Sequence, residues 1–237
     1  MAPDETTGET PDPTGDLSSG RETRARLVEA ATRAFADHGV QNASLLDITR
    51  QAGQRNRGAV HYHFGSRAGL LTTVLDQFTE VLAARERELL AVARERPDDD
   101  LGAAIEAVVR PSVEVAEGDW RGRCYLMIVA ELIADDQARA LDGVEEALAR
   151  TGGHEVYALI VERMPALLPD ALREERLTLM TGFVLRAIGD RARALGGDSP
   201  RRERLDTDAF VANLVAMAAA MLRAHPLPDV PASDLPA

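Results

Sequence analysis

The amino-acid sequence predicts an all-α protein, and three features of the 237-residue chain point to this class. Ala, Leu and Arg, which are strong helix formers, are abundant, whereas aromatic residues make up only 4% of the chain. Apolar side chains recur at helical spacing, and runs rich in Val, Ile, Thr and Tyr that would favour strands are nearly absent. Residues that cap or terminate helices separate the periodic segments.

The N-terminal segment differs in composition from the rest of the chain. Residues 1–19 are rich in Pro, Gly, Thr, Ser and Asp, with Leu17 the single large apolar side chain after Met1. Such a segment cannot offset its ordering entropy by burial, so we expect a disordered acidic tail. Ser19 and Glu22 form a capping-box pattern that predicts the start of the first helix, and Gly39 predicts its end.

Capping patterns also place the following helices. Ser44 opens a short helix that Gly53 closes, a third short helix is predicted to begin near Asn56, and Ser66 caps a long helix ending near Arg96. Further helices are predicted over 101–117, 123–134, 137–150, 154–168, 170–195 and 206–224. A flexible tail is expected over 226–237, which contains four prolines.

Charge is distributed unevenly along the chain, whose net charge is −12. Residues 1–20 carry five acidic residues and no arginine, whereas residues 21–67 carry eight arginines against four acidic residues, a net charge of +4. Residues 68–237 therefore carry −11. A small basic module joined to a large acidic body is typical of a DNA-binding protein whose second half serves another purpose.

Several kinds of site are excluded by the residues present. Cys124 is the single cysteine, so an intramolecular disulfide and a cysteine zinc cluster are excluded, and we expect this side chain to be small core rather than a redox sensor. His61 and His63 would lie about 200° apart on a helix, too far to share one ion. We expect no metal, no cofactor and no catalytic residue.

The chain shows neither a secretory signal nor a membrane span. A basic segment followed by an apolar run is missing at the N-terminus. The uncharged stretch Ala209–Leu222 has 14 residues, whereas a helix needs about 20 to cross a bilayer. We therefore expect a cytoplasmic protein that does not associate with membranes.

A short helix, a turn with glycine and a second short helix, packed on a preceding amphipathic helix, form the helix-turn-helix plan. In this plan the second helix enters the major groove of DNA. Residues 44–64 fit it. Their sequence and flanks resemble the DNA-binding domain of the tetracycline-repressor (TetR) family, and the resemblance rests on Leu27–Phe35, Gly39, Ser44, Asp47-Ile48, Ala52-Gly53, Gly58 through Arg67, and Leu70-Leu71.

Three positions depart from the family pattern. Thr49 replaces the usual Ala, Arg67 replaces the usual Lys, and the turn from Gly53 to Asn56 is one residue longer than the common form. The longer turn leaves the pairing of side chains with bases open by one position.

The resemblance implies a three-helix DNA-binding domain over 20–66 and a helical ligand-binding and dimerisation domain over 67–225. Two protomers would pair through the last two long helices into a homodimer that binds near-palindromic double-stranded operator DNA and a small-molecule effector. Broad apolar stripes support such pairing. They comprise Leu177, Met180, Val184 and Ile188 in one helix, and Phe210, Leu214, Met217 and Met221 in the other.

Roles in DNA binding can be assigned within the motif. We expect Asn56 to cap the recognition helix, and Arg57, Ala59 and His61 to contact bases, since a bidentate arginine discriminates guanine. Tyr62 and Arg67 are predicted phosphate contacts. The full set of predicted DNA contacts is Ser44, Arg55, Asn56, Arg57, Ala59, His61, Tyr62 and Arg67. The arginines could instead be ordinary solvated surface.

Aromatic and Met side chains in the acidic body are candidates for an apolar ligand pocket. These are Trp120, Tyr125, Met127, Tyr157, Met164, Met180 and Phe183. Each of them could equally be ordinary core. His154, which follows two glycines, is expected to be exposed.

The function predicted is that of a DNA-binding transcriptional regulator, a repressor released from its operator by a small, largely apolar ligand. One alternative is an enzyme built on the helical body, although no Gly-rich phosphate loop, nucleophile elbow or metal-ligand spacing is found. The other is a helical interaction protein without a DNA role. A mobility-shift assay on the protein's own upstream region would separate the regulator from both.

Overall fold

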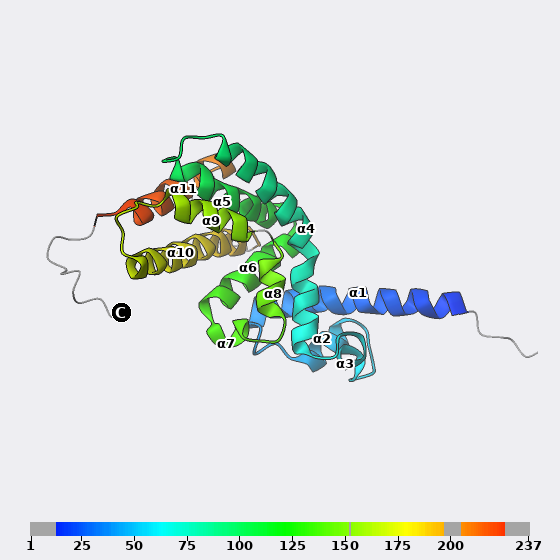
Figure 1. Cartoon of the computed structure of the whole chain (residues 1–237). Coiled ribbons are helices and arrows are strands. Elements are labelled where there is room, and N and C mark those ends of the chain that lie inside the picture. Colours follow the sequence, from blue (N-terminus) through cyan, green and yellow to red (C-terminus); the bar gives the residue numbers. More distant parts are fainter. Residues whose placement is uncertain (1–12, 152, 197–204, 226–237) are drawn as a thin grey trace, which may run out of the picture.

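The computed structural model describes residues 13–151, 153–196 and 205–225, and these residues form eleven helices and no strand. The all-α prediction is therefore confirmed for the described part of the chain (Figure 1). The helices are α1 (Pro13–His38), α2 (Leu45–Gln51), α3 (Ala59–Phe64), α4 (Arg67–Arg94), α5 (Leu101–Gly118), α6 (Trp120–Ala134), α7 (Asp136–Arg139), α8 (Val144–Ala149), α9 (Gly153–Arg163), α10 (Asp170–Gly196) and α11 (Thr207–Arg223). The tail expected over 226–237 lies outside the described residues, as do residues 1–12 of the expected acidic tail.

Helix α1 begins earlier than the sequence predicts. It starts at Pro13, so that Ser19 lies inside the helix and the predicted capping box of Ser19 and Glu22 is wrong. Proline is favoured at the first position of a helix because its missing N–H would have no partner there, and the glycines that follow only weaken a helix without ending it. Residues 13–19 are therefore helical rather than disordered, and α1 projects from the rest of the molecule (Figure 1).

The caps predicted for α2 and α4 are confirmed. Ser44 Oγ accepts a hydrogen bond of 3.2 Å from the Asp47 N–H, and Ser66 Oγ accepts one of 3.0 Å from the Gly69 N–H. Gly53 follows α2 with a φ of +72°, a left-handed conformation that suits glycine and ends the helix as predicted.

Three helix boundaries in the C-terminal body differ from prediction. Helix α6 starts at Trp120 rather than near residue 123, because the Asp119 carboxylate accepts hydrogen bonds from two N–H groups of its first turn. The helix predicted over 137–150 is split into α7 and α8 at Gly143, which adopts a φ of +76°. Helix α9 ends at Arg163 rather than near 168, because Pro165 disfavours the helical conformation in the residue before it.

The apolar core runs continuously through the described residues. It includes Phe35 in α1, Leu71 in α4, Ile105 in α5 and Ile128 in α6, all fully buried. Helix α5 is central to the body, since it packs against α4, α6, α9, α10 and α11. No helix in the described ranges is both long and apolar enough to cross a membrane.

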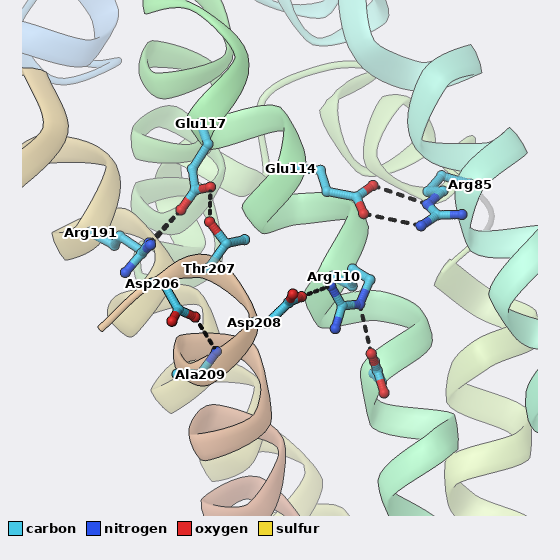
Figure 2. A network of polar contacts seen from close by, with 10 residues as sticks. Arg85, Arg110, Glu114, Glu117, Arg191, Asp206, Thr207, Asp208 and Ala209 are labelled. Carbon is cyan, nitrogen blue, oxygen red and sulfur yellow. Dashed lines mark hydrogen bonds and ion pairs between the residues drawn. The ribbon is translucent and has the colours of Figure 1, made fainter. Parts of the chain in front are cut away.

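A polar network ties one edge of α5 to three other helices (Figure 2). Glu117 accepts hydrogen bonds from Arg191 Nε of α10, at 2.7 Å, and from the Thr207 hydroxyl of α11. Glu114 pairs with Arg85 of α4 at 3.0 Å. Together with the buried face of α5, these contacts make α4, α5, α10 and α11 one packed body.

Candidate DNA interface and effector cavity

The outer face of α3 presents several of the predicted DNA contacts. Tyr62 is 83% exposed and His61 is also exposed, whereas Ala59 is 5% and Val60 is 3% exposed. With 3.6 residues per turn, residues 58, 61, 62 and 65 share one face of the helix, whereas Ala59 lies to the side of that face and is packed into the core. The prediction that Ala59 contacts a base is therefore wrong, because its side chain belongs to the core.

The recognition helix starts two to three residues later than predicted. Its N-cap is Gly58, with no side-chain cap, so the prediction that Asn56 is the N-cap residue of this helix is wrong. Asn56 Oδ1 instead accepts a hydrogen bond of 2.9 Å from the Gly58 N–H and thereby shapes the tight turn that leads into α3.

The two arginines of that turn are available to a ligand. Arg55 and Arg57 are exposed, and neither side chain has a hydrogen-bond or ion-pair partner among the described residues. Other arginines of the basic segment 21–67 are already engaged, since Arg33 pairs with Glu29 at 2.9 Å and Arg50 pairs with Asp47 at 2.6 Å. Arg55 and Arg57 therefore supply positive charge beside α3 without an internal partner to give up.

Arg67 and His61 also make contacts within the protein. Arg67 Nη1 donates to the Val40 carbonyl at 2.8 Å, and partial burial lowers the pKa of its guanidinium. The His61 Nδ1 atom lies 2.6 Å from the Gly65 carbonyl, at the C-terminal end of α3. Arg67 thus joins the start of α4 to the residue after Gly39, and a phosphate contact would have to use its other N–H groups.

A cavity of about 700 Å³ lies in the acidic body between α4, α5, α6, α8, α9 and α10. Of the seven residues predicted to line a ligand pocket, Tyr125 and Tyr157 line this cavity. The other five predicted pocket residues, Trp120, Met127, Met164, Met180 and Phe183, do not. Most of the lining is apolar, including Leu82, Val129, Ile133, Leu148, Leu177 and Leu185.

Packing explains why the other five residues do not line this cavity. Met164 and Met180 are 4% and 1% exposed and fill the core, and Met127 and Phe183 pack partly buried against it. Trp120 lies between two arginines, with the Arg33 guanidinium carbon 3.8 Å and that of Arg121 4.9 Å from its ring centre. Residue type alone did not distinguish cavity wall from core.

Among the polar groups of the cavity that the sequence did not predict is a buried carboxyl, that of Glu86. Glu86 is 4% exposed, its Oε2 atom has no hydrogen-bond partner in the described structure, and burial raises the pKa of its carboxyl to about 8. Within the charged run from Arg85 to Glu88 it looks like a surface residue. Helical spacing could have found it, because Glu86 lies four residues from Leu82 and four from Leu90, both buried.

Helix α6 connects the cavity to the DNA-binding helices. Tyr125 and Val129 on one side of it line the cavity. On another side, Glu131 Oε1 accepts a hydrogen bond of 2.8 Å from the Val40 N–H, and Arg121 lies 3.7 Å from Glu29 of α1. A shift of α6 would therefore move atoms at both sites.

The stripe predicted as a dimer seam in α10 packs inside the protomer instead. Met180, Val184 and Ile188 are at most 5% exposed, and Leu177 is half-buried. In α11, Leu214 is buried, whereas Met217 is 47% exposed beside exposed alanines. The outer surface of these helices therefore consists of a different set of apolar residues, with Leu179 at 55% exposure in α10.

A basic helix-turn-helix joined to a helical body with a cavity defines a DNA-binding transcriptional regulator. Residues 27–74 match the family described as "Bacterial regulatory proteins, tetR family", and residues 106–221 match "Tetracyclin repressor-like, C-terminal domain". The chain belongs to the TetR family of transcriptional regulators, and the prediction from the sequence is confirmed. Members of this family are regulators, so the alternative of an enzyme is excluded.

Relatives resemble the chain over part of its length. The HTH-type transcriptional regulator TtgR of Pseudomonas putida is 40% identical over 79 residues, which cover 33% of this chain and 35% of TtgR. The HTH-type transcriptional repressor KstR2 of Rhodococcus jostii is 30% identical over 129 residues, covering 54% of this chain and 60% of KstR2. The chain thus matches about a third to three fifths of the length of these relatives.

Solved structures show the same fold at low identity. The fatty acid degradation regulator FadR of Bacillus halodurans superposes with a TM-score of 0.53 at 15% identity, covering 91% of this chain and 99% of FadR. The ketosteroid regulator KstR2 of Mycobacterium tuberculosis superposes with a TM-score of 0.51 at 17% identity, covering 85% and 95%.

Proposed function

We propose that the protein is a transcriptional repressor that a small, largely apolar ligand releases from its operator. The observation that carries this proposal is the cavity of about 700 Å³, whose walls include α4 and α6. Both helices also contact the DNA-binding helices, α4 through Arg67 and α6 through Glu131. A repressor function is further supported by the similarity to the repressor KstR2 of Rhodococcus jostii.

On the DNA side, the proposed contacts are the exposed members of the predicted set. In this proposal Arg57 and His61, which are exposed, contact base edges and Tyr62 contacts a phosphate. Arg55 contacts either a base or a phosphate. Ser44 contributes by capping α2, and Asn56 by its hydrogen bond in the turn before α3.

The functional unit proposed is a homodimer joined through α10 and α11. Exposed Leu179 and Met217, with the small exposed residues Ala212, Ala216 and Ala220, offer an apolar surface that two copies could bury together. Two recognition helices related by a two-fold axis would need half-sites about 34–36 Å apart, or a multiple of that spacing, in a near-palindrome.

In this proposal the ligand acts through α4 and α6, the two helices that line the cavity and also contact the DNA-binding part. A ligand that binds better when α4 and α6 are displaced would shift the population toward protomers whose recognition helices no longer match successive grooves. By linkage, operator DNA would weaken ligand binding by the same factor, with a coupling of about 1–3 kcal/mol.

The proposed function is tested on DNA from the protein's own upstream region. Fluorescence anisotropy of this duplex should show saturable, salt-sensitive binding, and a reporter gene behind the same region should be transcribed less when the protein is present. Increased transcription would contradict repression, and equal affinity for this duplex and for unrelated DNA would contradict operator binding.

A further inference from the structure

The Glu86 carboxyl lies in the wall of the cavity, where its capacity to accept hydrogen bonds is not used by the described residues. It is 4% exposed, and its Oε2 atom has no hydrogen-bond partner in the described part of the chain. A Cβ atom added at Gly153, another residue of the wall, would lie 4.0 Å from this same Oε2 atom. The oxygen therefore borders the space between α4 and α9.

The arginines that flank Glu86 in the sequence do not neutralise it. Arg85 bonds Glu114 and Glu88, and Arg87 Nε donates to the Ala83 carbonyl on its own helix. Of the basic groups that line the cavity, Arg139 pairs with Glu145 at 2.9 Å, and His154 is exposed. A buried carboxylate without a counter-charge is unfavourable. If Glu86 had a structural role, its carboxyl would need a hydrogen-bond or ion-pair partner, and the described residues provide none.

The rest of the wall indicates what kind of partner would complete it. Tyr125 and Tyr157 contribute aromatic rings, and cations bind favourably to the faces of such rings. The Tyr157 hydroxyl is already paired with Thr181 at 2.8 Å, so its polar end is satisfied. The remaining wall is largely aliphatic, and residues 68–237 carry a net charge of −11 that attracts cations to the body.

We infer that the cavity binds an amphipathic organic cation, an apolar molecule with a single protonated amine whose ammonium group pairs with the Glu86 carboxylate. This inference rests on the proposed function, in which the cavity is the effector site. The inferred ligand is thus apolar except for one positively charged group. An anionic ligand would find the arginine of the wall, Arg139, already paired with Glu145.

Binding of such a cation must displace a proton. Burial raises the pKa of Glu86 to about 8, so the carboxyl of the empty cavity is mostly protonated at pH 7. When the ammonium ion enters, the Glu86 O–H bond breaks, the carboxylate remains to pair with the ligand, and the proton goes to solvent. The other ionisable groups of the wall are Tyr125, Tyr157, Arg139, Glu145 and His154. Comparison with a Glu86 variant therefore distinguishes a proton released by Glu86 from protons released by these other groups.

The test uses three ligands that share one apolar chain and differ only in the head group: decylammonium, 1-decanol and decanoate. Isothermal titration of the full-length protein at pH 7 should show decylammonium binding at least tenfold more tightly than 1-decanol, with decanoate the weakest. Titration in buffers of different ionisation enthalpy should show release of about one proton per decylammonium, as the pKa near 8 requires.

Two variants locate the effect. Glu86→Gln keeps the shape of the protonated carboxyl and should bind decylammonium and 1-decanol equally, without proton release. Glu80→Gln makes the same substitution on the exposed face of α4 and should behave as the wild type does.

A wild-type protein that fails to bind decylammonium, or binds 1-decanol as tightly, overturns the inference. So does a Glu86→Gln variant that keeps the preference for the amine, as non-specific surface binding would. The operator duplex is then added as a separate step. If decylammonium binds through Glu86 but does not release DNA, the inference stands and the proposed regulation fails.

Discussion

Glu131 Oε1 of α6 accepts a hydrogen bond of 2.8 Å from the N–H of Val40, the residue after Gly39. The carbonyl of the same residue accepts a hydrogen bond from Arg67 at the start of α4. The backbone that links α1 to α2 is thus held from both sides, by the helix that lines the cavity and by the helix that follows the recognition helix. We regard Val40 as the point where the two halves of the molecule are joined most directly.

The first prediction concerns this junction. Glu131→Ala leaves the partly buried Val40 N–H without its charged acceptor, so we expect the free energy of unfolding to fall by about 1–3 kcal/mol. Glu131→Gln keeps an acceptor oxygen and should lose less. Urea denaturation followed by circular dichroism measures both, and equal stability of Glu131→Ala and the wild type would show that the hydrogen bond contributes nothing.

The second prediction concerns sequence-specific DNA binding. Arg57→Ala removes an exposed guanidinium that has no internal partner, and should weaken operator binding about tenfold or more while relaxing the preference at one base position. Arg94→Ala, at the far end of α4, removes the same charge and should leave both properties unchanged. Anisotropy titrations against a set of single-base operator variants distinguish these outcomes, and loss of affinity in both variants alike would indicate a general charge effect.

The third prediction is a pH dependence of stability. The pKa of Glu86 is raised to about 8 in the folded protein, whereas an unperturbed Glu has a pKa near 4.5. Between these values the folded state binds more protons than the unfolded state, so this group's contribution to stability is full below pH 4.5 and declines as pH rises to 8. The slope should approach about 1.4 kcal/mol per pH unit.

Glu86→Gln cannot titrate and should lack this component of the slope. Denaturation of both proteins at pH 5, 6, 7 and 8 gives the difference directly, since all other titrating groups are shared. A difference in stability that does not change with pH would mean that Glu86 is ionised in the folded protein throughout.

The fourth prediction concerns the assembly. Met217→Asp places a charge on the exposed apolar surface of α11, and should dissociate the proposed dimer because burying an unpaired charge is unfavourable. Val161→Asp introduces the same charge on the exposed side of α9 and should leave the dimer intact. Sedimentation velocity at micromolar concentration measures both, and a monomeric wild type would refute the dimer.

Much of the fold was predictable because helix signals are local. The caps at Ser44 and Ser66 depend on residues within one turn, and both are confirmed by the hydrogen bonds that they accept. The recognition helix follows from a motif contained within residues 44–64. Its outer face was not predictable from periodicity, because Ala59 and Tyr62 are three residues apart and lie only about 60° from each other around the helix axis. Ala59 is buried because α2 and α4 pack against α3.

Tertiary packing decided what the local signals could not. Met164 and Met180 have the residue type of a pocket wall, yet their neighbours from other helices make them core, whereas Tyr125 and Tyr157 line the cavity. From the sequence, Glu86 resembles a surface residue because its neighbours in the chain are charged. In the structure it is buried, because α5, α6 and α9 pack against α4. The sequence determined the class of protein, the helices and the helix-turn-helix motif, because each depends on residues close together in the chain. The cavity and its unpaired carboxyl arise only where distant helices meet, and so they were decided by the tertiary structure.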